Sequence, residues 1–308
     1  MPQGACLSPT LFVLYVNDLL ESLGSACNLT AYADDTSFVI SGSNQLQLAN
    51  RCNVVLDSLA GWFSTNLLCL NPSKTQCIRF HTYQRDCAPV NISINDIQIK
   101  MVKSTNFLGL IIDEHLSWEP HCGSMVCKLN SMCFLFRSLR RILTLRQLIM
   151  LYHAQAESRL RYGITLWGAS SHAGEVFMGQ KRLMRCLLGL HFTDSCRNVF
   201  KDLRIMTLTS LYIYEVCLYI FKNKCSFLRN SDLHTFDTRF KSDFYVPYAR
   251  LDVTKKQPRL IGQLIFNKLP PGIKGHASFH IFKCSLKDLL LKHSFYTLED
   301  FFAAMAGG

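Results

Sequence analysis

Residues 31–36 read Ala31-Tyr32-Ala33-Asp34-Asp35-Thr36 and carry the strongest local signal in the sequence. An apolar run from Cys27 to Ala33 precedes the two carboxylates, and a second run, residues 37–40, follows them. This pattern predicts two strands joined by a tight acidic turn, because Asp side chains bond nearby backbone groups in turns. Adjacent carboxylates repel unless a cation lies between them, and Mg²⁺ prefers carboxylate oxygens. The turn therefore suggests half of a two-metal site, with a solvated Asp-Asp turn as the alternative.

The composition predicts a folded chain rather than a disordered one. The 308 residues suffice for two domains, and 49% of them are hydrophobic. Met1 leads into Pro-Gln-Gly with no apolar stretch behind a basic start, so we expect no secretory signal. The 14 cysteines are irregularly spaced, and we expect reduced thiols and no disulfide-linked partner. The most apolar window, 211–221, contains Glu215 and predicts a buried helix rather than a membrane span.

Charge is distributed unevenly along the chain. Residues 1–110 contain 6 Lys+Arg and 7 Asp+Glu, a net charge of −1, whereas residues 111–308 contain 27 and 15, a net charge of +12. A basic half beside a carboxylate pair suggests a polyanionic substrate. A merely soluble basic surface is the alternative.

The first part of the chain predicts a small α+β domain. Ser8 is the expected N-cap of a buried helix over 8–20 that Gly24 follows. An amphipathic helix is expected over 45–63, with Leu46, Val54, Leu56 and Leu59 among its core residues. The remaining pieces predict an antiparallel sheet: a hairpin of 67–70 with 74–80, short strands at 91–94 and 97–101, and one strand over 105–112.

Helical patterns dominate after Ser117, so we place a domain boundary near residue 115. The expected helices cover 118–140, 144–157, 177–189, 207–224 and 278–292. Basic residues recur on these helices at spacings of three and four, which suggests contact with phosphates, although for any single residue a solvated helix face is the simpler explanation. They are Arg137, Arg140, Arg141, Arg146, Lys181, Arg182 and Arg185. Cys122, Cys127 and Cys133 do not share one helix face and form no CxxC pair, which disfavours zinc.

Several motifs, in order, resemble those of reverse transcriptases from non-LTR retrotransposons, the jockey-like elements in particular. Residues 2–4 with 7–18 are similar to the loop and helix that line the nucleotide, and Tyr32-Ala33-Asp34-Asp35 is similar to the metal-binding hairpin. Residues 66–75 resemble the next palm motif, and Phe107-Leu108-Gly109 resembles the primer grip. Further matches are Leu116-Ser117-Trp118 with His121, Tyr162-Gly163, Trp167-Gly168 and residues 266–270.

The resemblance implies an RNA-directed DNA polymerase that uses two Mg²⁺ ions, an RNA template, a DNA primer duplex and dNTPs. Asp34 and Asp35 would hold the metals, and Lys74 would lie near the leaving pyrophosphate, a plain surface lysine being the alternative. Pro2, Gln3 and Gly4 would line nucleotide and template. Residues 1–115 would be a partial palm with an antiparallel sheet, and 116–308 a basic helical thumb and C-terminal extension. The family also implies nuclear action and no membrane.

The sequence departs from the family pattern in one respect. Reverse transcriptases carry another palm Asp and the fingers upstream of the Pro-Gln-Gly motif, and these 308 residues contain neither. We therefore expect the polypeptide to be inactive alone. The alternatives are a non-catalytic nucleic-acid-binding remnant that uses the basic half, and a chain of a decayed element without a selected function.

Overall fold

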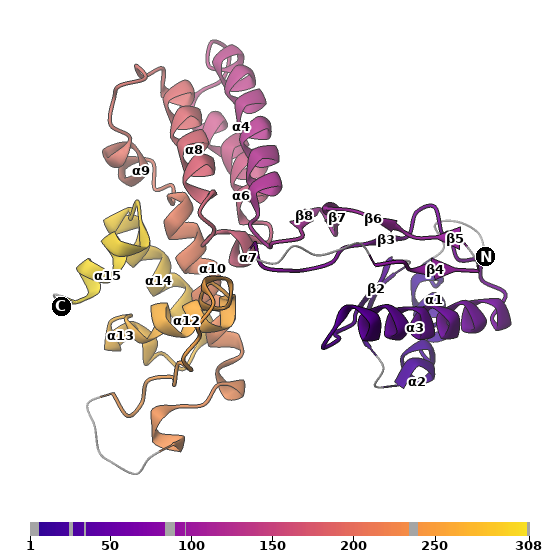
Figure 1. The fold of residues 1–308 in the computed structure, drawn as a ribbon. Coiled ribbons are helices and arrows are strands. Elements are labelled where there is room, and N and C mark those ends of the chain that lie inside the picture. The colour runs from indigo at the N-terminus through magenta and orange to yellow at the C-terminus, as the bar shows by residue number, and fades with distance from the viewer. Residues whose placement is uncertain are drawn as a thin grey trace. The chain divides into compact units, whose positions relative to one another are not determined.

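The computed structural model describes residues 6–24, 27–33, 35–83, 90–95, 97–233 and 240–306. The chain divides into two compact units, Met1–Thr105 and Asn106–Gly308, and each has its own buried core. The mixture of helices with small sheets agrees with the predicted α+β class (Figure 1). No helix in the described ranges combines the length and apolarity needed to cross a bilayer.

Within its described residues, the first unit has three helices and several short strands. Its core lies under helix α3 (Gln45–Thr65), whose Cys52, Leu56 and Leu59 pack against Leu19, Leu23 and the chain around Ile94. The other elements are α1 (Ser8–Tyr15), α2 (Leu19–Leu23), β1 (Asn28–Tyr32), β2 (Asp35–Val39), β3 (Gln76–Cys77), β4 (Ser93–Ile94), β5 (Ile97–Gln98) and β6 (Lys100–Met101).

The structure corrects the expected helix over 8–20. Two helices form instead, because the chain turns at residues 16–18, where the Leu19 amide bonds the Val16 carbonyl at 3.2 Å. The N-cap is Leu7 rather than Ser8, whose hydroxyl makes no capping bond. Helix α1 has no buried residue, so its apolar stripe was wrongly assigned to the core. Gly24 does end α2, with a φ of 54°.

Two expectations for the first unit's other elements were also wrong. Leu46 and Val54 are 73% and 62% exposed, because the buried stripe of α3 runs through Cys52, Val55, Leu56 and Leu59. The 67–70 segment forms no strand, and Gln76–Cys77 pairs in parallel with Lys100–Met101 rather than with a neighbour in sequence. The short strands β4 and β5 pair antiparallel, as predicted, with Ser93 opposite Gln98.

The expected strand over 105–112 is a hairpin instead. Strands β7 (Ser104–Phe107) and β8 (Leu110–Asp113) flank a two-residue turn in which Leu108 and Gly109 both have positive φ, 47° and 81°. Positive φ at both central residues is the type I′ geometry that matches strand twist. Leucine is not a typical turn residue, so the apolar run 107–112 gave no sign that the chain reverses direction at Leu108 and Gly109.

The second unit is helical, as predicted, and is built around α10. This helix (Leu208–Lys222) is buried along nearly its whole length, which confirms the buried helix expected at 211–221. The other helices are α4 (Glu119–Leu139), α5 (Leu145–Leu151), a π-helical segment (Tyr152–Glu157), α6 (Ser158–Arg161), α7 (Ile164–Trp167), α8 (Ala173–Leu188), α9 (Arg197–Asp202), α11 (Asp252–Lys255), α12 (Pro258–Asn267), α13 (Pro271–Lys274), α14 (Phe279–His293) and α15 (Leu298–Ala306).

Helices α4 and α8 lie side by side and run in the same direction (Figure 1). The Cys122 thiol lies 3.7 Å from the Ser170 hydroxyl near the start of both helices. A Cβ on Gly179 would lie 2.9 Å from Leu129 halfway along, so the missing side chain permits the close approach. Arg140 lies against Gly189 where both helices end.

Candidate functional site

The acidic turn joins a regular antiparallel hairpin. Strands β1 and β2 pair with Asn28 opposite Val39 and Tyr32 opposite Asp35, and the Ser37 hydroxyl donates to the Thr30 carbonyl at 3.2 Å. Ala33 has a φ of 53°, the left-handed conformation that a two-residue turn requires. Asp34 lies outside the described residues.

Asp35 begins β2 with its side chain exposed, and Tyr32, across the ladder, is 66% exposed. An exposed carboxylate offers hard oxygen donors, and a second carboxylate is adjacent in sequence. This donor set fits Mg²⁺ and does not fit a soft metal such as zinc. Residues 2–4, expected to line the nucleotide, lie outside the described residues.

Lys74 lies in a turn that residue 71 organises. The Asn71 carbonyl accepts from the backbone amides of Lys74 and Thr75 at 3.2 and 3.1 Å, and the Asn71 side chain accepts from the Ser73 hydroxyl at 2.6 Å. These bonds give the Asn-Pro-Ser-Lys-Thr stretch a structural role of its own. The Lys74 side chain is exposed.

The expected primer-grip residues form the type I′ turn of the β7–β8 hairpin, and a second motif holds that turn. The Tyr162 hydroxyl donates to the Leu108 carbonyl at 2.5 Å, and a Cβ on Gly109 would lie 3.4 Å from the same ring. Gly163, with a φ of 62°, leaves room for Leu110, which would lie 2.8 Å from a Cβ there. Two motifs far apart in sequence therefore meet at one place.

A buried carboxylate that the sequence did not reveal lies at the end of β8. Asp113 is 7% exposed and accepts from the backbone amides of His115, Ser117 and Trp118 at 3.2, 3.0 and 2.9 Å. Burial raises the pKa of this carboxyl, but the hydrogen bonds from Ser117, Trp118 and His115 outweigh burial and leave the pKa lowered. Asp113 thus shapes the loop that carries the Leu-Ser-Trp motif. The sequence signal that could have revealed this carboxylate is an Asp at the end of an apolar strand.

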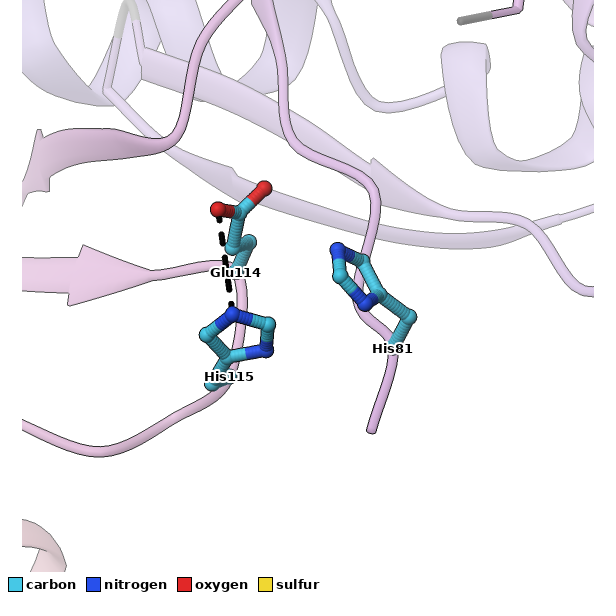
Figure 2. Close-up of side chains that lie close together, drawn as sticks. All are labelled: His81, Glu114 and His115. Atoms are coloured by element: carbon cyan, nitrogen blue, oxygen red, sulfur yellow. Dashed lines mark ion pairs between the residues drawn. The ribbon is translucent and has the colours of Figure 1, made fainter. Parts of the chain in front are cut away.

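The same loop contains an ion pair between neighbouring residues. His115 Nε2 lies 3.8 Å from Glu114 Oε1, an ion pair that Figure 2 marks with a dashed line and that requires a protonated imidazole.

His121, on α4, is 3% exposed, and its Nδ1 accepts from the Ile111 amide at 3.3 Å. Burial, followed by the charge of Lys128, lowers the pKa of His121. The motif histidine is therefore a neutral core residue that ties α4 to β8.

The predicted basic residues do not form one cluster. Arg182 donates to the Asn130 side chain at 3.1 Å, on the α4 side of α8. Lys181 and Arg185 point elsewhere. Lys181 Nζ lies 5.5 Å from the centroid of the Tyr296 ring, and Arg185 donates to the Asp194 carbonyl at 3.0 Å.

Three of the predicted cations lie at the C-terminal ends of α4 and α8. Arg137 is in the last turn of α4, Arg140 follows it as the C-cap, and Arg185 is in the last turn of α8. Cations there complement the helix dipole, which explains their positions without a ligand. Arg141 and Arg146 are exposed between α4 and α5 and on α5.

Two buried thiols on α4, those of Cys122 and Cys133, resist ionisation. Burial raises the pKa of the Cys122 thiol to about 11, and burial with the nearby Cys186 raises that of Cys133 to about 12. Zinc binds thiolates, so these environments oppose metal binding.

Comparisons with known proteins find a similarity that includes these motifs. Residues 1–112 match the family model described as reverse transcriptase (RNA-dependent DNA polymerase). The matched segment contains the β1–β2 hairpin, the Lys74 turn and the β7–β8 turn. The resemblance to the reverse transcriptases of non-LTR retrotransposons is thereby confirmed.

Curated relatives carry the similarity beyond the family model. A probable RNA-directed DNA polymerase from transposon BS of Drosophila melanogaster is 27% identical over 222 residues, 67% of this chain and 24% of that protein. The corresponding protein from the Drosophila X-element is 22% identical over 215 residues, again 67% of this chain and 24% of that protein. A Pol polyprotein from the type-1 retrotransposable element R1 of Bradysia coprophila is 25% identical over 170 residues, covering 54% and 17%.

The chain thus spans about a quarter of the length of the first two relatives. No solved structure matches it significantly.

Proposed function

We propose that this chain supplies part of the catalytic palm of an RNA-directed DNA polymerase, with Asp34 and Asp35 as carboxylate ligands of two Mg²⁺ ions. The observation that carries the proposal is the Tyr-Ala-Asp-Asp sequence at the turn of a regular hairpin, within the segment that the reverse transcriptase model matches. The metals would activate the primer 3′-hydroxyl and neutralise the triphosphate of the incoming dNTP.

The chain's own residues would position the other reactants. Gln3 and Gly4 would line nucleotide and template, and Phe107, Leu108 and Gly109 would hold the primer end. The turn at Leu108 suits that role because its backbone is held by the Tyr162 hydroxyl. Lys74, in its fixed turn, would face the leaving pyrophosphate. The helices of the second unit would contact the phosphates of the template–primer duplex.

Metal binding is tested on the polypeptide alone. We expect Mn²⁺, used as a paramagnetic substitute for Mg²⁺, to bind weakly to the wild type and to lose that site in Asp34→Asn/Asp35→Asn. Electron paramagnetic resonance measures free Mn²⁺ directly. Asp57→Asn on the exposed face of α3 is the matched control. Equal binding by the wild type and the double variant would contradict the proposed ligands.

Polymerase activity needs a separate test, because the family pattern uses a third aspartate that these 308 residues do not contain. We expect no primer extension by the 308-residue polypeptide on an RNA template with Mg²⁺ and dNTPs. A fusion to the upstream reverse transcriptase segment of the transposon BS relative should extend the primer. Asp35→Ala in that fusion should reduce the rate at least 10²-fold, on the scale of a lost charge-stabilising group.

Extension by the unfused polypeptide that Asp35→Ala abolishes would show that the third aspartate is dispensable. Extension by the fusion that survives both Asp34→Ala and Asp35→Ala would remove the hairpin from the catalytic site. Asp57→Ala controls for a general effect of removing a carboxylate.

A second candidate function rests on the charge distribution. The net charge of +12 over residues 111–308 favours nucleic-acid binding by the helical unit without catalysis. This function predicts duplex binding that falls steeply with salt and is unchanged by Asp34→Ala.

A further inference from the structure

The second unit has a concave basic surface where α9 and α14 end. A cavity of about 480 Å³ is lined by Lys201, Arg204, Asp288, Leu291 and Lys292. Three cations face one carboxylate, which leaves a net charge of +2 on the lining. We call Lys201, Arg204 and Lys292 the α9 basic surface.

Little in the protein neutralises this charge. Within the described residues, Lys201 and Lys292 have no carboxylate within 4.0 Å. Arg204 pairs with Asp288 at 3.0 Å, but both side chains are about 70% exposed, at 72% and 70%. An exposed ion pair of this kind is weak, so Asp288 does not prevent Arg204 from binding another anion.

The electrostatic effect of the two lysines reaches a neighbouring side chain. His293 follows Lys292 at the end of α14, and its ring stacks on Phe295 with centroids 5.2 Å apart. Burial, then the charges of Lys292 and Lys201, lower the pKa of His293. Both ammonium groups therefore make the electrostatic potential around His293 more positive.

Arg204 is held there at a conformational cost. Its φ is 51°, the left-handed conformation that usually falls to glycine after a helix. The Ile205 amide bonds the Phe200 carbonyl at 2.9 Å, the pattern that closes such helix ends. An arginine in this conformation is strained relative to glycine, so the helix ending alone does not explain why an arginine is found here.

We propose that the α9 basic surface binds the phosphate backbone of a nucleic acid. The row of cations continues along α9 to Arg197, one turn or about 6 Å before Lys201, and so is longer than a single phosphate group. Arg197 pairs with Asp300 at 3.4 Å, again between exposed side chains. Arg197 lies 4.6 Å from the centroid of the Tyr296 ring, which also contacts Lys181. An extended polyanion matches this arrangement better than a free phosphate ion.

The proposal rests on the proposed function for the class of ligand but not on catalysis. The competing explanation is structural, since Lys201 and Lys292 lie in the last turns of α9 and α14, where a cation stabilises the helix dipole. That explanation predicts a change in stability and none in affinity.

The test is fluorescence anisotropy of a labelled RNA–DNA duplex with the full 308-residue chain over a range of salt concentrations. We expect Lys201→Gln/Lys292→Gln to weaken binding about fivefold per lost contact near 0.15 M salt, and to reduce the slope of log K against log salt by about 0.9 per contact. Lys283→Gln/Lys287→Gln, with the same charge change on other faces of α14, is the matched control and should have little effect.

Arg204→Gly separates the two explanations further. Removing the side chain relieves the left-handed strain, so Tm should rise while affinity falls. Retained affinity and an unchanged salt slope in both Lys201→Gln/Lys292→Gln and Arg204→Gly would overturn the proposal. Competition by inorganic phosphate that is as effective as competition by unlabelled duplex would also overturn it. The Asp35→Ala variant should bind the duplex with wild-type affinity. The polymerase proposal is therefore tested by metal binding and primer extension, and its failure would leave the anisotropy result unchanged.

Discussion

Asp113 organises the loop after β8 with one carboxylate. Three backbone amides converge on it from His115, Ser117 and Trp118, of which Trp118 has a left-handed backbone with a φ of 65°. Charged acceptors make stronger hydrogen bonds than neutral ones, which compensates for the burial of the group. The Leu-Ser-Trp motif is therefore explained at least in part by local folding.

We expect Asp113→Asn to destabilise the second unit by about 1–3 kcal/mol at pH 7, because an amide nitrogen cannot accept a hydrogen bond and at least one buried amide loses its partner. Urea unfolding followed by circular dichroism measures this. The pKa of Asp113 is lower in the folded chain than its ordinary value of 3.8, so the folded state binds fewer protons.

The carboxylate's contribution is thus fully present above about pH 3.8 and is lost as the pH falls through the lowered folded-state value. The difference between wild type and Asp113→Asn should shrink over the same interval. A difference that stays constant down to the lowest accessible pH would show that the charge of Asp113 is not what stabilises the loop.

At the scale of the element, glycines explain two motifs of the second unit. Gly168 packs under the buried Tyr212 ring, and a Cβ there would lie 2.7 Å from the Ile164 carbonyl oxygen. Gly163 starts α7 in the left-handed conformation. The Tyr-Gly and Trp-Gly pairs are therefore requirements of packing and of turn geometry.

Gly168→Ala should destabilise the second unit by about 1–3 kcal/mol, as expected for overpacking against backbone and a buried ring. Gly174→Ala is the matched control, because α8 leaves open space around that position, and it should be neutral or slightly stabilising. Differential scanning calorimetry of both variants gives the comparison. Similar Tm values for the two would rule out the steric explanation for Gly168.

The sequence predicted helices better than strands, for physical reasons. Helices α3, α4, α10 and α14 match their predicted ranges within a few residues, because a 3.6-residue stripe is a local pattern. The parallel pairing of β3 with β6 depends on residues more than twenty positions apart and has no local signal. The turn at Leu108 was missed because leucine rarely adopts positive φ.

At the scale of the molecule, the two units differ greatly in the size of their cores. The first unit buries few apolar side chains around α3, whereas the second buries a large contiguous cluster centred on α10. The sequence predicted the basic character of the second part. It could not show which cations share a surface, since Arg182 and Lys181 are adjacent in sequence and point to different neighbours.

We expect the first unit to unfold at a lower urea concentration than the second, because stability grows with the apolar area that a domain buries. Tryptophan fluorescence separates the two transitions, since Trp62 belongs to the first unit and Trp118 and Trp167 to the second. Trp62→Phe should remove the early transition and leave the late one. A single transition shared by all three tryptophans would contradict the expectation.

Helix α1 has a consequence for the chain inside a cell. Its side chains Val13 and Leu14 are 58% and 67% exposed, Leu11 and Tyr15 are 43% and 48% exposed, and the N-cap residue Leu7 is 66% exposed. Molecular chaperones and proteolytic quality control select such accessible apolar segments. The lifetime of the polypeptide would then depend on how quickly this one helix is covered, whatever chemistry the acidic hairpin performs.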